Sequence, residues 1–272
     1  MFKSIVFILT LICLSFSVKL IAPYEKEIGN GDLIDLGTIG PGQTVSLQLD
    51  PSVTSGGIYG SGGIYDFALV SSVPSGWKST DSKLYQKPMQ ITITADPFAK
   101  EGEYISTIVI VDENNGEKLG NITFKAKIKI TYDVLDVEIS PKTYKNIGPG
   151  QPARFEVSIT NKGSTSDVFE ISAIGPKSWS YKQQIFVPSK STRKIYYEVA
   201  AQEEETYKTT LKIVSLASEK IFEEQEVSIQ VRSDLIGDYL AVNRGTIIFP
   251  IFETPIYALA GLVANVFRLV GA

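Results

Sequence analysis

The 272-residue chain contains no histidine and one cysteine, Cys13. A lone cysteine cannot staple a domain with an internal disulfide. Without His or further Cys, the chain has no Ser-His-Asp or Cys-His system for nucleophilic catalysis and no ordinary zinc site. Enzymatic chemistry would be left to carboxylates, so we predict a non-enzymatic protein with no cofactor and no metal site.

The chain also lacks a stretch of one charge. Its 26 Lys and Arg are scattered among 30 Asp and Glu, for a net charge of −4. A protein that neutralises phosphates needs a basic patch or stripe, so nucleic acid is not an expected partner. A hydrophobic fraction of 43% with 21% charged residues suits a folded protein with a buried core.

The first residues, MFKSIVFILTLICLSFSVKL, have the features of a signal peptide. A basic Lys3 precedes an apolar run, and Ser15 and Ser17 are the small residues of a cleavage site. We predict a signal peptide over residues 1–17, an exported protein, and a mature chain that begins at Val18. The alternative is an uncleaved anchor, although the apolar run is shorter than the ~20 residues of a membrane span.

The pentapeptide IGPGQ occurs twice, at Ile39–Gln43 and Ile147–Gln151. Other landmarks recur in the same order, including a tryptophan and a tyrosine that leads an apolar alternating segment. A period of about 100 residues indicates duplicated domains, because the repeats of solenoids are shorter. We predict domains at 18–132 and 133–232. Their short linker, around Thr131–Val134, has no Gly or Pro and predicts an end-to-end stack with limited hinge freedom.

Both copies have the period-two alternation of half-buried strands. Each IGPGQ predicts a corner between two strands, since Pro fixes φ and the glycines permit a tight turn. With about seven short strands in about 100 residues, we predict an all-β chain of two tandem immunoglobulin-like β-sandwiches. The segments expected as strands in the first copy are 45–49, 64–72, 89–95, 104–111 and 121–130. Those in the second copy are 135–140, 153–160, 167–172, a short piece near Trp179, 193–200, 207–214 and 223–231.

Four aromatic residues have two interpretations each. Tyr104 and Tyr207 follow acidic loops, where a tyrosine corner of a Greek-key sandwich lies; the alternative is an exposed binding aromatic. Trp77 and Trp179 follow Gly or Pro turns. We favour packing over the end of each sandwich, and stacking against a ligand is the alternative.

The second copy resembles the NEW3 or CARDB type of immunoglobulin-like domain found in surface proteins of archaea and bacteria. The resemblance rests on FEVSITNKGSTSDVFEISAIGPKSWSY followed by IFVPSKSTRKIYYEVAAQEEETYKTTLKIV: a strand ending in Asn161-x-Gly163, a turn before Trp179, and a strand led by Tyr207. It covers about residues 135–232 well and 32–132 loosely. The resemblance implies an immunoglobulin-like fold and a location at the cell surface. It also implies that the domains act as spacers or interaction modules.

After Arg232 the periodicity changes. Ser233 to Gly245 predicts a short amphipathic helix, and an almost wholly apolar helix is predicted from Pro255. A helix apolar all round is buried in protein or lipid. We predict that residues 233–272 contact membrane lipid or the helices of membrane proteins; docking on the second domain or on another copy are the alternatives. The candidate membrane residues are Ile256, Leu259, Gly261, Leu262, Val266 and Phe267.

Three loop features complete the candidates. The stretch SGGIYGSGGIYDF places Tyr59 and Tyr65 on glycine-rich backbone, which predicts an aromatic contact loop or a long hairpin with Tyr65 already in a strand. The Asn-Gly of DENNGEK predicts a hairpin turn. Asn121 begins an Asn-Ile-Thr sequon and is a possible N-glycosylation site.

Together these features predict an exported protein on the extracellular side of the cell membrane, anchored by its C-terminal tail, that acts as an adhesion or envelope-structural module. One alternative is an accessory subunit of a membrane secretion or envelope-assembly complex. The other is a carbohydrate-binding module. The partner classes are therefore membrane, protein or glycan.

Overall fold

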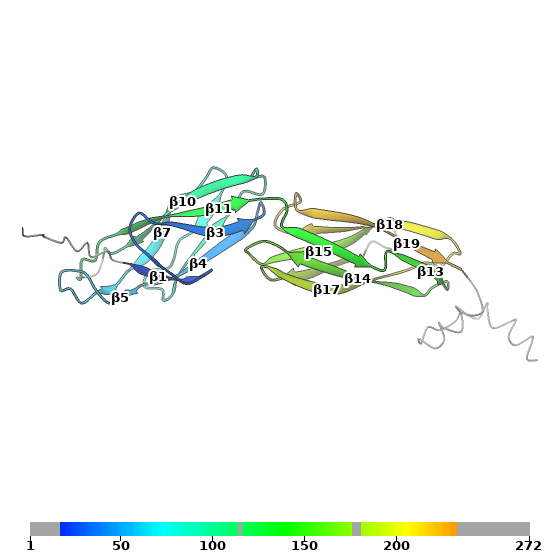
Figure 1. The fold of residues 1–272 in the computed structure, drawn as a ribbon, viewed down its shortest axis with the longest axis horizontal. Helices are drawn as coiled ribbons and strands as arrows, with labels where there is room; N and C mark the ends of the chain where they lie inside the picture. The colour runs from blue at the N-terminus through cyan, green and yellow to red at the C-terminus, as the bar shows by residue number, and fades with distance from the viewer. Residues whose placement is uncertain (1–16, 114–115, 176–180, 233–272) are drawn as a thin grey trace, which may run out of the picture.

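The computed structural model describes residues 17–113, 116–175 and 181–232. All regular elements within these residues are β-strands, which confirms the predicted all-β class for this part of the chain. They form two β-sandwiches placed end to end along the long axis of the molecule (Figure 1). Nearly the whole predicted signal peptide, Trp179 and the predicted helical tail lie outside the described residues.

The first sandwich is built from two main sheets. One has the order β2-β1-β4-β9-β8 and the other the order β3-β11-β10-β7, while β5 and β6 pair separately. The strands are β1 (Val18–Ala22), β2 (Lys26–Ile28), β3 (Leu33–Ile39), β4 (Thr44–Asp50), β5 (Ser52–Val53), β6 (Gly63–Ile64), β7 (Phe67–Ser72), β8 (Lys78–Thr80), β9 (Met89–Thr94), β10 (Gly102–Val111) and β11 (Ile122–Ile130).

The second sandwich has sheets of order β12-β14-β17 and β13-β19-β18-β15-β16. Its strands β14 and β17 pair antiparallel over ten residues each. The strands are β12 (Leu135–Ser140), β13 (Thr143–Ile147), β14 (Pro152–Asn161), β15 (Asp167–Ile174), β16 (Lys182–Val187), β17 (Ser191–Ala200), β18 (Thr206–Ser215) and β19 (Phe222–Val231).

The two sandwiches share an entry path that the sequence analysis did not predict. The first strand, β1 or β12, pairs antiparallel with β4 or β14. The chain then crosses to the other sheet, where β3 or β13 runs parallel to the last strand, β11 or β19. The later strands follow the order of immunoglobulin-type sandwiches. Strands β1, β2 and β13 were not predicted because they are short; the longer β3 was not predicted either.

Each sandwich has its own hydrophobic core, which explains the period-two pattern. Strand β12 alternates buried and exposed residues along its whole length. The largest fully buried side chains include Phe124 in the first core and Phe155, Phe169 and Tyr197 in the second. Burying one such large side chain contributes about 1.5–3 kcal/mol.

For Tyr104, Tyr207 and Trp77 the structure supports packing, while Trp179 lies outside the described residues. Tyr104 Oη donates to Lys100 O at 3.0 Å and Tyr207 Oη donates to Glu203 O at 3.3 Å, so both form tyrosine corners. Trp77 is 7% exposed and its ring lies 5.1 Å from that of Tyr104. Trp77 therefore packs over the sandwich and offers no face to a ligand.

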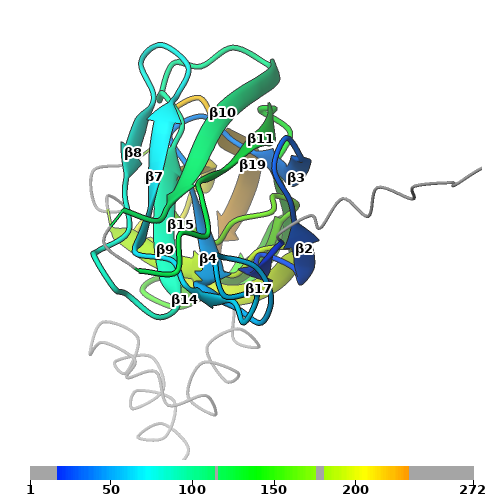
Figure 2. The same cartoon turned by 90° about the vertical axis from the view of Figure 1, so that its left-hand side faces the viewer.

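The linker between the sandwiches is short. Strand β11 ends at Ile130 and β12 begins at Leu135. Viewed along the long axis, one sandwich lies in front of the other (Figure 2). The turn that follows β3 contacts the loops that precede β15 and β19, and these segments form the junction between the sandwiches.

Candidate functional site: the junction between the sandwiches

Both IGPGQ segments form the predicted corner, with the same internal hydrogen bonds. Gly42 and Gly150 have φ values of +72° and +76°, which favour glycine. Gln43 Oε1 accepts from Gly40 N at 2.7 Å, and Gln151 Oε1 accepts from Gly148 N at 3.1 Å. The turn is thus a self-contained unit that each copy builds in the same way.

The first turn also has a second role, which is to receive the second sandwich. A Cβ on Gly40 would lie 2.2 Å from Ile221 Cδ1, and one on Gly42 would lie 2.0 Å from Ala217 O. Real side chains do not approach this closely. The absence of a Cβ at these positions allows the backbone of one domain to lie directly against the other.

A buried polar pair joins the domains beside this turn. Gln43 Nε2 donates to Asp167 Oδ2 at 2.6 Å, with the two residues 2% and 7% exposed. The same Asp167 Oδ2 accepts from Ser215 Oγ at 2.7 Å. A buried carboxylate is costly unless hydrogen bonds satisfy it. Gln43, in the first sandwich, supplies one of those hydrogen bonds. The buried side chain of Asp167 in the second sandwich is therefore partly satisfied by the turn of the first.

Asn161 shapes the loop that carries Asp167. Its side chain is fully buried, and Nδ2 donates to Thr165 O at 2.8 Å and to Val187 O at 3.2 Å. Its Oδ1 accepts from Gly163 N at 2.9 Å. The Asn-x-Gly pattern noted in the sequence is therefore the internal frame of the loop that docks on the first domain.

Hydrogen bonds from backbone and serine groups close the rim of the junction. Thr38 N donates to Ser164 Oγ at 3.0 Å and Ser164 N donates to Thr38 O at 2.7 Å. Ser218 Oγ donates to Pro97 O at 3.0 Å on another side. Contacts on several sides of a short linker limit hinge motion.

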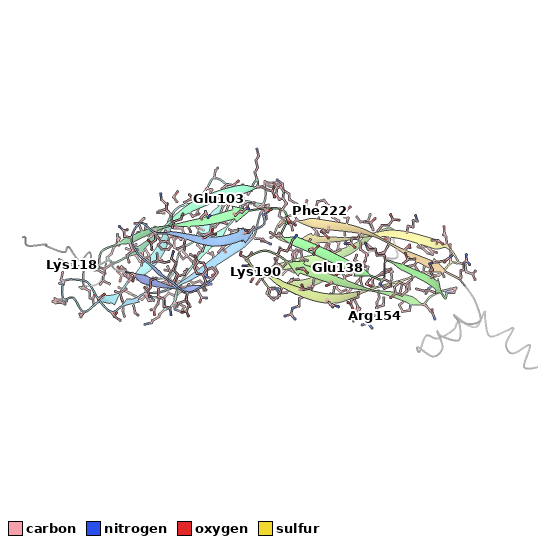
Figure 3. All side chains as sticks on the ribbon, viewed as in Figure 1. Glu103, Lys118, Glu138, Arg154, Lys190 and Phe222 are labelled. Atoms are coloured by element: carbon pink, nitrogen blue, oxygen red, sulfur yellow. The ribbon has the colours of Figure 1, made fainter. Side chains whose placement is uncertain are left out.

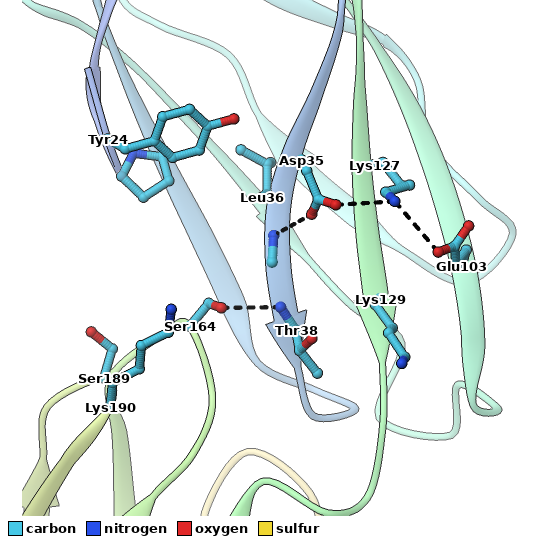
Figure 4. A pocket seen from close by; sticks show the side chains of 12 residues that line it. Tyr24, Asp35, Leu36, Thr38, Glu103, Lys127, Lys129, Ser164, Ser189 and Lys190 are labelled. Carbon is cyan, nitrogen blue, oxygen red and sulfur yellow. Dashed lines mark hydrogen bonds and ion pairs between the residues drawn. The ribbon is translucent and has the colours of Figure 1, made fainter. Parts of the chain in front are cut away.

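A groove of about 600 Å³ lies beside the junction and is lined by both sandwiches (Figure 4). The first domain contributes Tyr24 and the edge of β3, and the second contributes Ser164 and Lys190. Figure 3 shows Glu103 and Lys190 on opposite sides of the junction. No sequence pattern indicates this groove, because its two walls lie far apart in the chain.

Three ionisable groups that line the groove form ion pairs with one another. Lys127 Nζ lies 3.0 Å from Asp35 Oδ2 and 3.4 Å from Glu103 Oε1. The hydrogen bond from Gly37 N, followed by that from Lys127, lowers the pKa of Asp35. The hydrogen bond to Asp35 raises the pKa of Lys127. Both groups thus stay charged at neutral pH and make a structural pair rather than a proton donor and acceptor.

The glycine-rich loop lies at the free end of the first sandwich, and here the structure corrects one prediction. Tyr59 is 76% exposed, but Tyr65 is fully buried in the first core. Tyr65 is therefore wrong as an exposed contact residue. The glycines let the loop lie close to the β10–β11 hairpin: Ile58 N donates to Glu117 O at 2.8 Å, and a Cβ on Gly57 would lie 2.4 Å from that oxygen.

The buried hydroxyl of Tyr65 leads to a prediction. It has no hydrogen-bond partner among the described residues, and burial, with a smaller effect of Asp112, raises its pKa to about 12. An unsatisfied buried hydroxyl costs about 1–3 kcal/mol. We expect Tyr65→Phe to leave stability unchanged or raise it by about 1 kcal/mol in thermal unfolding, with Tyr59→Phe unchanged as the exposed control. A loss of stability in Tyr65→Phe would show that the hydroxyl is satisfied.

The remaining predicted site residues divide between the surface and the tail. Asn121 is exposed, and its Oδ1 accepts from Asp112 N at 3.1 Å, so glycosylation stays a prediction. Strands β10 and β11 on either side of DENNGEK pair antiparallel, while Asn115 of the expected Asn-Gly turn lies outside the described residues. The tail candidates Ile256, Leu259, Gly261, Leu262, Val266 and Phe267 lie outside the described residues.

Two further findings concern the described residues alone. No helix among them is both long and apolar enough to cross a membrane. They also contain no group of three or more His, Cys, Asp or Glu residues arranged to hold a metal ion.

No protein-family model and no curated protein sequence matches the chain. Solved structures resemble parts of it. A chain of the human seminal plasma complex of zinc 2-glycoprotein and prolactin inducible protein has 9% identity and a TM-score of 0.30, and the match covers 37% of this chain and 95% of that one. The CARDB domain of a Pyrococcus furiosus protein, in complex with di-metal ions, has 17% identity and a TM-score of 0.29, covering 36% and 87%.

A mutant of Salmonella alpha-2-macroglobulin has 13% identity and a TM-score of 0.29. That match covers 72% of this chain and 16% of the macroglobulin. At these identities and scores, none of the three matches supports an inference about activity or ligands.

Proposed function

We propose that this protein is a non-enzymatic, exported and membrane-tethered module of the cell surface, with an adhesion or envelope-structural role. In this proposal the two sandwiches are a stiff spacer on the extracellular side and residues 233–272 are the anchor. The observation that carries it is the junction, where Gln43 and Asp167 make a buried bond between the domains. Such a contact fixes the orientation of one sandwich relative to the other, and with it the length that the pair spans.

The placement of the two ends supports the proposal. Strand β19 ends at the end of the second sandwich that is remote from the first (Figure 1). The next residue, Arg232, donates its N–H to Ile147 O at 2.9 Å. The glycine-rich loop that carries Tyr59 connects β5 and β6, at the opposite end of the molecule (Figure 1). At the start, β1 begins with the fully buried Val18, directly after the predicted cleavage point. A tether at one end would thus hold the exposed loop away from the membrane.

Membership of the NEW3 or CARDB type is part of the proposal. Its supports are the strand order, the two tyrosine corners and the Asn161–Gly163 turn. Such domains serve as spacers and interaction modules. This role agrees with the contact between the ends of the two sandwiches.

Partners of the module would be protein or glycan, and not nucleic acid. Many basic side chains are paired across strands, as Lys194 is with Glu156 and Lys182 with Glu170, each at 2.6 Å. A second candidate function is an accessory subunit of a membrane secretion or envelope-assembly complex. The exposure of Ile58 and Tyr59, 58% and 76%, favours it, because paired apolar side chains at a tip suit contact with another protein.

Membrane partition tests the proposal. We expect the full chain to require detergent for extraction after carbonate washing, and a truncation ending at Arg232 to stay soluble, with external protease cleaving the sandwiches in intact cells. Retention of a stoichiometric membrane protein after detergent extraction would favour the accessory-subunit function. If both forms remain soluble, the tether is wrong and a secreted binding module replaces it.

A further inference from the structure

The groove beside the junction holds more positive charge than its ion pairs use. Three lysines and two carboxylates line it. Lys127 lies between the carboxylates of Asp35 and Glu103. Lys129 and Lys190 have no carboxylate within ion-pair distance among the described residues. Each sandwich therefore contributes one lysine whose charge is open to a ligand.

The backbone holds Lys190 at the wall of the groove in an unusual conformation. Its N–H donates to Gly163 O at 3.2 Å, on the loop that Asn161 frames. Its φ is +49°, which glycine adopts with less strain than a residue with a Cβ. The side chain is exposed and makes no hydrogen bond to a described residue, so the fold itself does not require a lysine here. Strained positions of this kind cluster where a ligand is bound.

The other polar groups that line the groove are mainly hydroxyls. The side-chain oxygens of Tyr24 and Ser189 have no hydrogen-bond partner among the described residues. Ser164 Oγ accepts from Thr38 N at 3.0 Å, which leaves its own proton for another acceptor. These hydroxyls suit a ligand that is itself rich in oxygen atoms.

The apolar part of the lining is small and flat. Leu36 is 2% exposed, so the accessible apolar surface consists of Pro23 and the ring of Tyr24, which is 39% exposed. A peptide is usually held by apolar anchors in deep pockets, and this lining offers none. A sugar ring needs only a flat surface for its C–H face and polar groups around it.

The positions of the two free lysines bear on the charge of the ligand. In the view of Figure 4, Lys190 and Lys129 lie on either side of the bonded pair Thr38 and Ser164. They come from opposite walls of the groove, Lys190 from the second sandwich and Lys129 from the first. A chain with an anionic group on successive units can pair with both lysines, whereas a single anion would leave one of them unpaired.

We propose that the groove binds an acidic polysaccharide of the uronic-acid class, with a carboxylate on each sugar unit. Lys129 and Lys190 pair with carboxylates, Ser164 and Ser189 donate to sugar oxygens, and the ring of Tyr24 packs against a sugar ring. Both sandwiches supply these groups, so the site is complete only while the junction is closed. Binding does not require the membrane tether, and a soluble full chain would leave this inference intact.

Calorimetric titration of the full chain, purified in detergent, tests the ligand class. The probes are oligomers of galacturonic, glucuronic and mannuronic acid, the methyl esters of the same oligomers, and poly-glutamate of matched charge. We expect at least one free acid to bind, with its ester and poly-glutamate about tenfold weaker or more. The ester keeps the sugar and removes the charge, while poly-glutamate keeps the charge and removes the sugar. Equal binding of acid and ester, equal binding of poly-glutamate, or no binding of any acid would each overturn the proposal.

A matched pair of variants tests the location of the site. Lys190 and Lys118 are both exposed and have φ values of +49° and +51°, but Lys118 lies at the free end of the first sandwich (Figure 3). We expect Lys190→Gln to weaken binding of the acid about fivefold or more, because a charge-assisted hydrogen bond is lost. Lys118→Gln should leave binding unchanged. Equal affinities of the two variants would place the ligand outside the groove.

Proteolysis of the linker tests whether both walls take part. A ligand that binds only the closed junction slows cleavage through the open form by the factor 1 + [L]/Kd, which is about tenfold at ten times Kd. We expect this protection in the linker Thr131–Val134 with the acid that binds, and none with its ester at the same concentration. Unchanged cleavage with the acid bound would place the ligand on one sandwich alone and overturn the two-walled site.

Discussion

Gly42→Ala is expected to release the two sandwiches from each other, whereas Gly150→Ala leaves them joined. Both substitutions place alanine at a positive φ, +72° and +76°, which costs about 1–2 kcal/mol in either turn. The difference lies in what the new methyl group meets. At Gly42 it would lie 2.0 Å from Ala217 O, and at Gly150 no closer than 3.8 Å to Gln202.

The pair of variants therefore separates backbone strain from collision at the junction. The carbonyl of Ala217 belongs to the backbone and cannot rotate away, so the second sandwich must shift and the buried Gln43–Asp167 bond must lengthen or break. A buried hydrogen bond to a charged group is worth about 1.5–3 kcal/mol. We expect the total loss in Gly42→Ala to be about 3 kcal/mol or more, against about 1–2 kcal/mol in Gly150→Ala.

Limited proteolysis and small-angle scattering measure this difference. Cleavage in the linker Thr131–Val134 should be at least tenfold faster in Gly42→Ala than in Gly150→Ala, in line with a loss of about 1.4 kcal/mol per tenfold. The scattering curve of Gly42→Ala should indicate a wider range of interdomain angles. Equal cleavage rates in the two variants would mean that the contact at Ala217 does not hold the domains together.

Asn161→Ala is expected to be the most destabilising polar substitution in the second sandwich. The side chain is fully buried and makes three hydrogen bonds, to Thr165 O, to Val187 O and from Gly163 N. Each backbone group left unsatisfied costs about 1–3 kcal/mol. The expected loss is about 3–5 kcal/mol.

Urea unfolding of the full chain measures this loss as a lower midpoint for the second sandwich. Asn161→Asp keeps the acceptor for Gly163 N but removes both donors, so it should recover little of the stability. Lys145→Ala, at an exposed position of the same domain, is the control and should change stability by less than about 0.5 kcal/mol. If Asn161→Ala lowers stability no more than the control does, interactions other than those of Asn161 hold the loop.

These two variants also distinguish the stability of a domain from the stability of the junction. Asn161 lies within the second sandwich and frames the loop that carries Asp167, so its loss should weaken the fold first and the docking as a consequence. Gly42 lies in the first sandwich and contacts the second, so its substitution should weaken the docking beyond what strain in the turn explains. A stiff spacer needs a stable second domain and a stable junction, since a stable domain on a flexible hinge has no set orientation relative to the first.

The sequence by itself determined the features that depend on local physics. Alternation such as that of Leu135–Ser140 predicts a strand with one buried face, because side chains point to opposite sides of a strand in turn. IGPGQ predicts a corner because φ of Pro and Gly is a property of those residues. The duplication and the tyrosine corners at Tyr104 and Tyr207 follow from order and spacing along the chain.

Only the tertiary structure decided what each local feature meets. Two IGPGQ turns with the same internal bonds have different surroundings, because Gly40 and Gly42 face a neighbouring domain that approaches within the space of a missing Cβ. The partner of Gln43 is Asp167, more than a hundred positions away in the chain, and no periodicity records that proximity. Tyr65 stands in a glycine-rich loop yet lies in the core, because burial is decided by how the loop folds back and not by the glycines beside it.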